Sequence, residues 1–315
     1  MYDVVTIGSA VVDIFIQSDE FELQPSKGGV FLASTAGDKL LVDDFSLRTG
    51  GGAGNSAVGF SRLGFRTAVI TEVGVDVWSK IIEEEFHKEF VATNEIAREK
   101  REKTGGSVVL LGKNGVRTIL VHRGASSMLD PVDIPKKVLQ TSDWVHVTNV
   151  SARVDTLETI FTMLSKKKSK NVSWNPGRKE LELIAKNKIS KLFLESCHIF
   201  LVNAEEWNIV KTHRREILEK IPIVVVTNGA DGGQVFHNGE NIQYSAKKVK
   251  SVDNTGAGDA FGMGFVAAIL KKQDVDRAIK WGQESAEHVV QQLGAKPGLR
   301  TLNEIKNATW NTPTT

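Results

Sequence analysis

The sequence predicts an α/β fold with a doubly wound, mostly parallel sheet and a small β-sheet lid. Short apolar runs recur along the chain without the polar alternation of a half-exposed strand, which is typical of strands covered on both faces. Helical patterns lie between these runs, and repeated β-then-α units favour a parallel sheet between two helix layers. Two turn-rich stretches without helical periodicity predict the lid.

The main sheet is predicted from six apolar runs, and most helical patterns lie between them. Strands are expected at residues 4–7, 67–73, 144–147, 172–174, 199–202 and 223–227. Helices are expected between them at residues 55–63, 78–88, 156–168, 181–194 and 204–211. Two further helices, 258–271 and 275–292, follow each other near the C-terminal end.

The lid is predicted at residues 14–50 and 104–123. The second stretch has apolar runs at 107–111 and 116–122 around Lys113-Asn114-Gly115, and Asn-Gly between such runs is a strong β-hairpin signal. The segments 1–13, 51–103 and 124–315 then form the α/β body. A small sheet beside such a body suggests a lid that closes on a substrate. A structural extension of the sheet edge is the alternative.

Composition excludes several classes of function. The formal net charge of the 315 residues is only +2, so no nucleic-acid partner is expected. Cys197 is the only cysteine, which rules out an intramolecular disulfide and favours a reducing compartment. The chain has no signal-peptide pattern and no run of about 18 apolar residues that would span a membrane. A cytoplasmic location is expected.

A glycine-rich turn precedes the helix expected at 258–271. Asp253-Asn254-Thr255-Gly256-Ala257-Gly258-Asp259 is rich in turn residues, and an apolar helical stretch follows it. Glycines allow the backbone to approach an anion, and a helix N-terminus offers unpaired N–H groups and partial positive charge. This pattern predicts a site for a phosphoryl group. Asp259 would either cap the helix or take a proton from an attacking hydroxyl.

The same seven residues resemble the D-T-x-G-A-G-D pattern of the ribokinase-like (PfkB) family of sugar and nucleoside kinases, with Asn254 in place of the usual Thr. The resemblance implies that Asp259 is the catalytic base and that Gly256, Ala257 and Gly258 form the anion hole. The family often binds a monovalent cation such as K⁺ near this loop. Asp253 and Thr255 are then its candidate ligands.

An N-terminal motif supports the resemblance and also offers an alternative. Gly52-x-Gly54-x-x-Ala57, with Glu72 downstream, fits a dinucleotide fingerprint and an NAD(P)-dependent oxidoreductase. That fingerprint should follow the first buried strand immediately, and here it begins near residue 50. The wider segment resembles the family's G-G-x-x-x-N-x-A motif with a shorter spacer. This resemblance implies that Gly51, Gly52 and Asn55 bind substrate hydroxyls.

Further positions along the chain match the family in the right order. Asp13, after the first strand, matches its substrate aspartate, and Asn149 is a looser candidate for the substrate site. Asn203 and Glu206 match the N-x-x-E pattern near the ATP phosphates and Mg²⁺, although they also fit a helix capping box. The loop at 227–232 resembles the family's T-x-G-x-x-G nucleotide loop, and the nucleotide candidates are Thr227, Gly229, Gly232 and Gln283.

The resemblance therefore implies an ATP-dependent kinase that phosphorylates a hydroxyl of a ribose- or fructose-like sugar. A nucleoside is the second expectation, because the stretch between Asp13 and Gly51 could build a larger lid. A sugar phosphate is the third, because Arg117, Arg123 and Arg178 could meet an anion. A sugar sensor without turnover is a further class, which an intact Asp259 disfavours. A homodimer through the lid is also considered.

Overall fold

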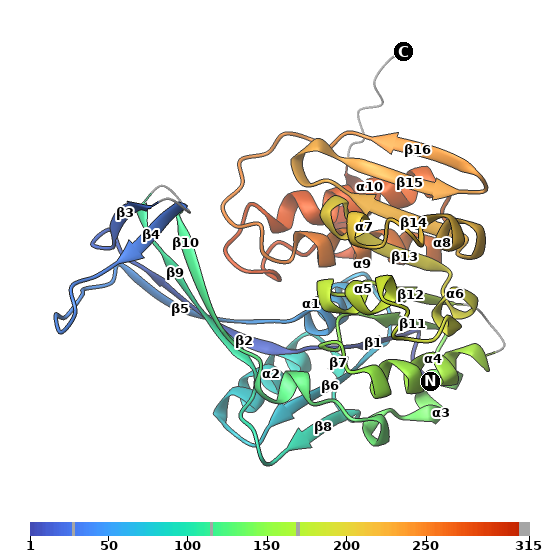
Figure 1. Ribbon diagram of the computed structural model, residues 1–315, viewed down its shortest axis with the longest axis horizontal. Coiled ribbons are helices and arrows are strands. Elements are labelled where there is room, and N and C mark those ends of the chain that lie inside the picture. Colours follow the sequence, from blue (N-terminus) through green and yellow to red (C-terminus); the bar gives the residue numbers. More distant parts are fainter. Residues whose placement is uncertain (27–28, 114–115, 168–170, 309–315) are drawn as a thin grey trace.

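The computed structural model describes residues 1–26, 29–113, 116–167 and 171–308. In this part of the chain ten strands form the main sheet, in the order β16-β15-β14-β13-β12-β11-β1-β6-β7, with β8 also paired to β6 (Figure 1). All pairs are parallel except β14-β15-β16. The strands are β1 (Val4–Ile7), β6 (Thr67–Gly74), β7 (Val91–Ala92), β8 (Ile96–Glu99), β11 (Trp144–Val147), β12 (Val172–Trp174), β13 (Ile199–Asn203), β14 (Ile223–Thr227), β15 (Gly233–His237) and β16 (Glu240–Tyr244).

Helices cover both faces of this sheet, as the sequence predicts. One apolar core lies under α1 (Gly52–Arg62), α2 (Val77–Lys88), α9 (Ala257–Leu270), α10 (Val275–Val289) and α11 (Leu302–Asn307). The other lies under α3 (Lys136–Thr141), α4 (Val154–Ser165), α5 (Arg178–Ala185), α6 (Leu192–Ser196), α7 (Ala204–Ile209) and α8 (Arg214–Lys220). Neighbouring residues of a strand enter opposite cores: Val4 faces the first and Val5 the second.

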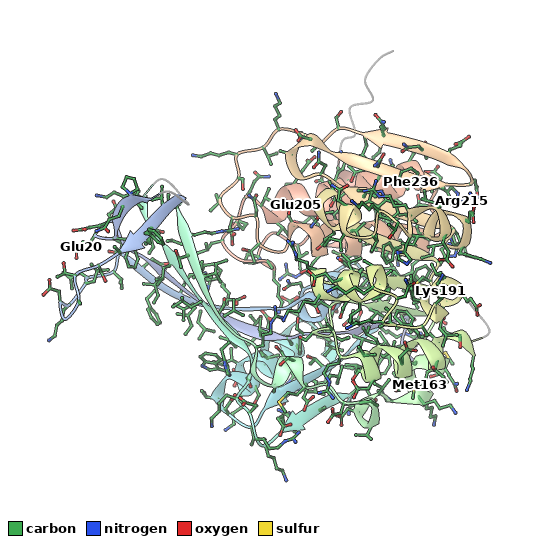
Figure 2. The ribbon with its side chains drawn as sticks, in the orientation of Figure 1. Glu20, Met163, Lys191, Glu205, Arg215 and Phe236 are labelled. Carbon is green, nitrogen blue, oxygen red and sulfur yellow. The ribbon has the colours of Figure 1, made fainter. Side chains whose placement is uncertain are left out.

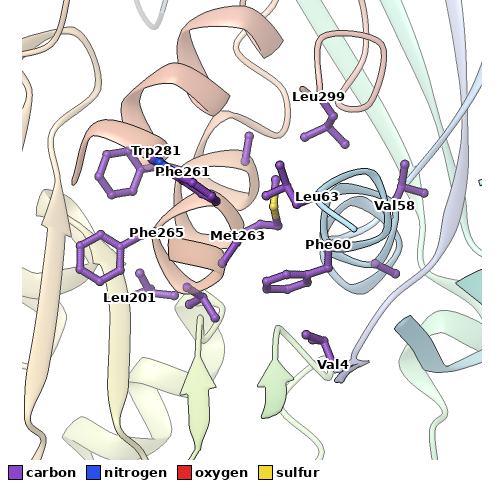
Figure 3. Packing of buried hydrophobic residues seen from close by; sticks show 14 of the residues in the cluster. Val4, Val58, Phe60, Leu63, Leu201, Phe261, Met263, Phe265, Trp281 and Leu299 are labelled. Carbon is purple, nitrogen blue, oxygen red and sulfur yellow. The ribbon is translucent and has the colours of Figure 1, made fainter. Parts of the chain in front are cut away.

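Helices α1 and α9 pack closely, and this packing places the two glycine motifs side by side. Met263 of α9 lies against α1 near Leu63 and Phe60, all of them buried (Figure 3). A Cβ atom at Gly59 would come within 2.9 Å of the Met263 sulfur, so glycine permits this approach. Because both helices begin at the same end of the contact, a Cβ atom on Gly52 would stand 3.5 Å from an Asp259 carboxylate oxygen.

The lid is a separate mixed sheet that projects from the body (Figure 1). Its order is β10-β9-β2-β5, in which β2 and β9 are parallel and the outer pairs antiparallel. The strands are β2 (Val11–Gln17), β5 (Asp44–Gly50), β9 (Gly106–Leu111) and β10 (Arg117–His122), and a hairpin of β3 (Glu22–Ser26) and β4 (Gly29–Ala33) accompanies them. The expected turn at Asn114-Gly115 lies outside the described residues, and the exact lid boundaries stay a prediction.

One predicted helix is wrong. The sequence predicts a continuous helix over 181–194, but α5 ends at Ala185 and α6 begins at Leu192. Asn187 has a φ of 50°, the left-handed conformation with which many helices end, and the backbone N–H of Lys188 bonds to Leu183 O. Asparagine tolerates this conformation better than most residues, so it stops the helix there.

Two features agree with the composition. Cys197 is buried, and burial raises the pKa of its thiol above the ordinary value, so it is an inert core residue. Within the described ranges, no helix combines the length and apolarity that crossing a bilayer requires.

Candidate active site

Polar residues gather where the parallel strands of the main sheet end. Asn175 follows β12, Asn203 ends β13 and Thr227 ends β14, and parallel strands bring these ends to one edge. With Glu206, Asp259 and the glycines at the start of α9, they line an open pocket of about 210 Å³. The pocket therefore joins the sheet edge to the N-terminus of α9.

The glycine loop at 256–258 has the backbone geometry of an anion site. Gly256 is the N-cap of α9 with a φ of 77°, and a Cβ atom there would overlap the Ala295 side chain. A Cβ atom added to Gly258 would meet no atom within 4 Å, so the surface of this glycine is open. The 14-residue helix presents its free N–H groups and its positive end to the pocket.

Asp259 lies in the first turn of α9 and contacts the other glycine motif. Asn55 Nδ2 donates to Asp259 Oδ2 at 2.8 Å. Burial raises the pKa of Asp259, and the hydrogen bond from Asn55 partly opposes this rise. Asn55 is itself buried, and its Oδ1 has no hydrogen-bond partner in the described chain. A substrate hydroxyl would satisfy this acceptor, because a buried amide oxygen is costly to leave unpaired.

Asp13 lies on β2 of the lid sheet, and its cross-strand partners on the same face are Arg48 of β5 and Ser107 of β9. Ser107 Oγ donates to Asp13 Oδ1 at 2.5 Å. Burial raises the pKa of Asp13, while the bond from Ser107 lowers it. A side chain at Gly50 would overlap the Asp13 carboxylate, so the glycine leaves room for it.

Gly51 and Gly52 open α1 beside this carboxylate. Gly51 is the N-cap with a φ of 89°, and a Cβ atom on it would lie 2.5 Å from Ser9 O. A Cβ atom on Gly52 would lie 3.1 Å from Thr148 Oγ1. Glycine at both positions thus permits the start of α1 to pack closely against Ser9 and Thr148, and Gly52 also lies near Asp259.

Asn203 and Glu206 form the capping box that the sequence allows, and they also line the pocket. Asn203 Oδ1 accepts from Glu206 N at 2.8 Å, and Glu206 Oε2 accepts from Asn203 N at 2.9 Å. Burial raises the pKa of Glu206, and repulsion from Asp259 adds to the rise. The capping role and a role in the pocket coexist, because Glu206 Oε1 receives no hydrogen bond from the described residues.

The pocket lining does not include the expected site residues Ala257, Asn149, Gly229, Gly232 and Gln283. Asn149 accepts from Ser151 N at 2.7 Å and packs against Gly177. Gly229 and Gly232 shape the turn after Thr227, with φ of 54° and 94°. Gln283 Nε2 donates to Ser245 O at 2.7 Å.

The candidate cation ligands Asp253 and Thr255 are bonded to each other. Thr255 Oγ1 donates to Asp253 Oδ1 at 2.7 Å, and the Thr255 amide donates to the same oxygen at 3.0 Å. Among the residues with described positions, no three His, Cys, Asp or Glu side chains gather as a metal site.

Sequence reasoning missed three supporting residues. Asn175 lines the pocket, and a polar residue directly after a buried strand was the signal for it. Ser107 was expected only as a hairpin residue, because its pairing with Asp13 spans 94 positions. Lys296 is buried, donates to Thr49 at 2.7 Å and pairs with Glu85, which ties a lid strand to the body. No local motif marks Lys296.

The dinucleotide interpretation does not fit the fold. Helix α1 follows β5, a lid strand, and not a strand of the main sheet. Glu72 is buried on β6, where burial and the nearby carboxylates of Asp133 and Glu99 raise its pKa to about 7. A ribose ligand would need an accessible carboxylate at the glycine turn.

Comparison with known proteins agrees with this geometry. A ribokinase of Haemophilus influenzae is 27% identical over 279 residues, which cover 85% of this chain and 89% of the relative. A nucleoside kinase of Methanocaldococcus jannaschii is 24% identical over 264 residues, which cover 81% and 83%. An Escherichia coli protein solved in complex with ATP and Mg²⁺ shares the fold, with a TM-score of 0.80, 21% identity, and coverage of 97% of this chain and 98% of its own.

The family model described as "pfkB family carbohydrate kinase" matches residues 1–302. The match spans the lid, both glycine motifs and the pocket residues. The chain therefore belongs to the PfkB carbohydrate kinase family and is a phosphotransferase with an alcohol group as acceptor.

Proposed function

We propose that this kinase transfers the γ-phosphoryl group of ATP to a hydroxyl of a ribose- or fructose-like sugar, with Asp259 as the general base. One observation carries the proposal. Asp259 stands in the first turn of α9, faces an open pocket beside Gly256 and Gly258, and is bonded to Asn55 of the other glycine motif. A base, an anion site and a substrate-side amide thus meet at one point.

The chemical step follows from this arrangement. Asp259 takes the proton of the acceptor hydroxyl as its oxygen attacks the γ-phosphorus, and the bond to the β-phosphate oxygen breaks. The N–H groups of Gly256 and Gly258 would hold the charge on the transferred group, whereas the Ala257 N–H donates to Asn254 O at 3.3 Å. The raised pKa of Asp259 makes it a better proton acceptor than an exposed aspartate.

For Mg²⁺-ATP we propose this pocket at the sheet edge. Asn203, Glu206 and Thr227 supply oxygen atoms, and Glu206 Oε1 is free of protein donors within the described chain. The metal would neutralise phosphate charge when bound, with Glu206 holding it through water. For the nucleotide we propose Thr227 and the turn formed by Gly229 and Gly232. Gln283 would have to release Ser245 O before its amide faced adenine.

The acceptor is proposed to lie between the lid and α1. Asp13 and Asn55 would bind its hydroxyls, and the backbone of Gly51 and Gly52 would lie against the ring. Asp13 approaches from the lid, whereas Asn55 approaches from the body beside the base. Asn149 would reach this space only after leaving Ser151 N.

Asn55→Ala and Glu206→Gln form a matched test of this division. We expect Asn55→Ala to raise the KM for the acceptor by about tenfold or more, with little change for ATP, because it removes a hydroxyl partner. Glu206→Gln should instead raise the Mg²⁺ concentration needed for half-maximal rate. Steady-state kinetics with each ligand varied in turn measure both effects. The reverse ordering would reassign the two loops.

The acceptor itself is tested by an ATP-coupled screen of pentoses, hexoses, nucleosides and sugar phosphates. A pentose or ketohexose with the highest kcat/KM would support the proposal, and a nucleoside would favour the second candidate, which the nucleoside kinase relative supports. Two of the three arginines named for a sugar phosphate are engaged, since Arg117 pairs with Asp253 and Arg178 with Glu182, so a sugar phosphate as best acceptor would point to Arg123. Binding of a sugar without ADP release would indicate a sensor.

We also propose a homodimer through the lid. The lid face opposite Asp13 carries seven apolar side chains in register, and Phe45 and Leu120 are 63% and 57% exposed. A second copy would cover this face. The face comprises Ile14, Ile16, Phe45, Leu47, Val108, Leu110 and Leu120.

Light scattering should then give twice the 34.5 kDa chain mass, and Phe45→Glu should give a monomer, because a carboxylate cannot be buried unpaired in that face. Val132→Glu is the control, at a position that is 90% exposed and outside the lid. A monomeric wild-type protein at micromolar concentration would rule the dimer out.

A further inference from the structure

An ion pair joins the tip of the lid to the glycine loop. Arg117 begins β10, and its Nη1 donates to Asp253 Oδ1 at 2.7 Å. Arg117 pairs with Leu111 of β9, and Leu111 pairs with Gln17 of β2. Because Gln17 lies four residues after Asp13 on β2, Arg117 and Asp13 are on the same face of the lid sheet. The lid face that holds the substrate aspartate thus also holds a cation against the residue that begins the anion loop.

The Asp253 carboxylate is buried and almost fully bonded. Its Oδ1 accepts from Arg117 and from the amide and hydroxyl of Thr255, and its Oδ2 accepts from Gly294 N at 3.0 Å. Although burial acts to raise its pKa, these bonds and the charge of Arg117 lower it. The protein therefore supplies both the hydrogen-bond donors of the ionised Asp253 carboxylate and the positive charge that pairs with it.

This bonding leaves poor room for the monovalent cation that the family resemblance implies. Three donors already occupy Oδ1, and a guanidinium stands where a second positive charge would be repelled. Thr255 Oγ1 donates its hydrogen to Asp253 and keeps its lone pairs, so the case against a cation rests on Asp253 and on the charge of Arg117. Asp253 thus does not fit the role of a cation ligand while Arg117 is in place.

We propose that Arg117 is a positioning residue that replaces a monovalent cation at the glycine loop and fixes this loop only when the lid is closed. The proposal rests on the proposed kinase function. Asp253 bonds both Thr255, one residue before Gly256, and Gly294, whose neighbour Ala295 packs on Gly256. The ionised Asp253 carboxylate therefore holds both sides of the anion loop. Arg117 of the lid supplies the positive charge that pairs with it.

The test compares wild-type protein with Arg117→Ala, Arg117→Lys and Arg215→Ala, in K⁺ and in tetramethylammonium buffers of equal ionic strength. Arg215 is a matched surface arginine that is 91% exposed, on the side of the body away from the lid (Figure 2). We expect the wild-type and Arg215→Ala rates to change less than about twofold between the cations. Arg117→Ala should lose about 10- to 100-fold in kcat in tetramethylammonium and recover part of it in K⁺.

Arg117→Lys should behave like wild type, because it keeps a positive charge at this point. Thermal unfolding gives a readout without substrate: K⁺ should raise the Tm of Arg117→Ala by about 3 °C and leave that of the wild type unchanged. Strong activation of the wild type by K⁺, or an Arg117→Ala variant indifferent to K⁺ in both rate and Tm, would overturn the proposal. If no acceptor is phosphorylated, the kinase assignment fails while the Tm comparison still decides the role of Arg117.

Discussion

Replacing Asp259 by asparagine is expected to reduce kcat by at least about 100-fold while ATP binds almost as before. The amide keeps the size of the side chain and can still accept from Asn55, but it cannot take a proton from the acceptor hydroxyl. The residues proposed for ATP lie on other elements, at the ends of β13 and β14 and on α7. Positioning and charge stabilisation remain, so some residual turnover is expected.

The pH dependence and the stability of this variant follow from the raised pKa of Asp259. The base acts when ionised, so wild-type kcat/KM should fall as the pH drops through a pKa above the ordinary 3.8. The folded carboxyl holds its proton more tightly than the unfolded one, so ionisation at neutral pH destabilises the fold. Asp259→Asn should lose the acidic limb of the profile and unfold at the same or a higher temperature.

Three measurements separate the base from a helix cap. They are kcat with saturating substrates, ATP affinity by calorimetry, and the unfolding temperature. A mere cap would cost stability when changed and leave the rate nearly intact. A variant with more than a tenth of the wild-type rate would refute the assignment of Asp259 as the base.

Gly256→Ala is expected to have the second largest effect, a loss of about 10²–10³ in kcat with a smaller change in acceptor KM. Gly256 has a φ of 77°, and an added methyl group would overlap Ala295. The loop must shift to relieve this overlap, which moves the N–H groups away from the transferred phosphoryl group. Steady-state kinetics and a crystal structure of the variant measure the two changes.

Gly239→Ala is the matched control for backbone strain. Gly239 also has a positive φ, 79°, but lies in the turn between β15 and β16 with no atom within 4 Å of an added Cβ. It should lose about 1 kcal/mol of stability from the strained conformation and keep its kinetics. Equal rate losses in both variants would show that strain alone explains the Gly256 effect.

The local patterns predicted the body well, because each depends on neighbours in sequence. The strands at 4–7, 144–147, 172–174 and 223–227 have the predicted bounds, and α1 begins only three residues early. The hairpin of β15 and β16 was not predicted, although Asn238-Gly239 is the same dipeptide that indicated the lid hairpin. The left-handed Asn187 that ends α5 also had a sequence signal, because asparagine is common at that position.

The site was only partly predictable, because its contacts join distant segments. The two glycine motifs were recognised separately, but the bond from Asn55 to Asp259 crosses 204 residues. Ser107 meets Asp13 through the parallel pairing of β2 and β9, and Arg117 meets Asp253 across 136 residues. No spacing rule in one sequence reports such pairs, since only the packing of α1 on α9 and the contacts of the lid strands create them.

The two-sheet construction divides the labour of the enzyme along its chain. The carboxylate proposed to grip the acceptor stands on the lid, whereas the base and the anion loop stand on a helix of the body. A replacement beside Asp13 on β2 or β9 can therefore alter the choice of alcohol while Asp259 keeps its place on α9. Such a scaffold can acquire new acceptors through changes near Asp13, provided that Arg117 still meets Asp253, while the same helix end performs the reaction.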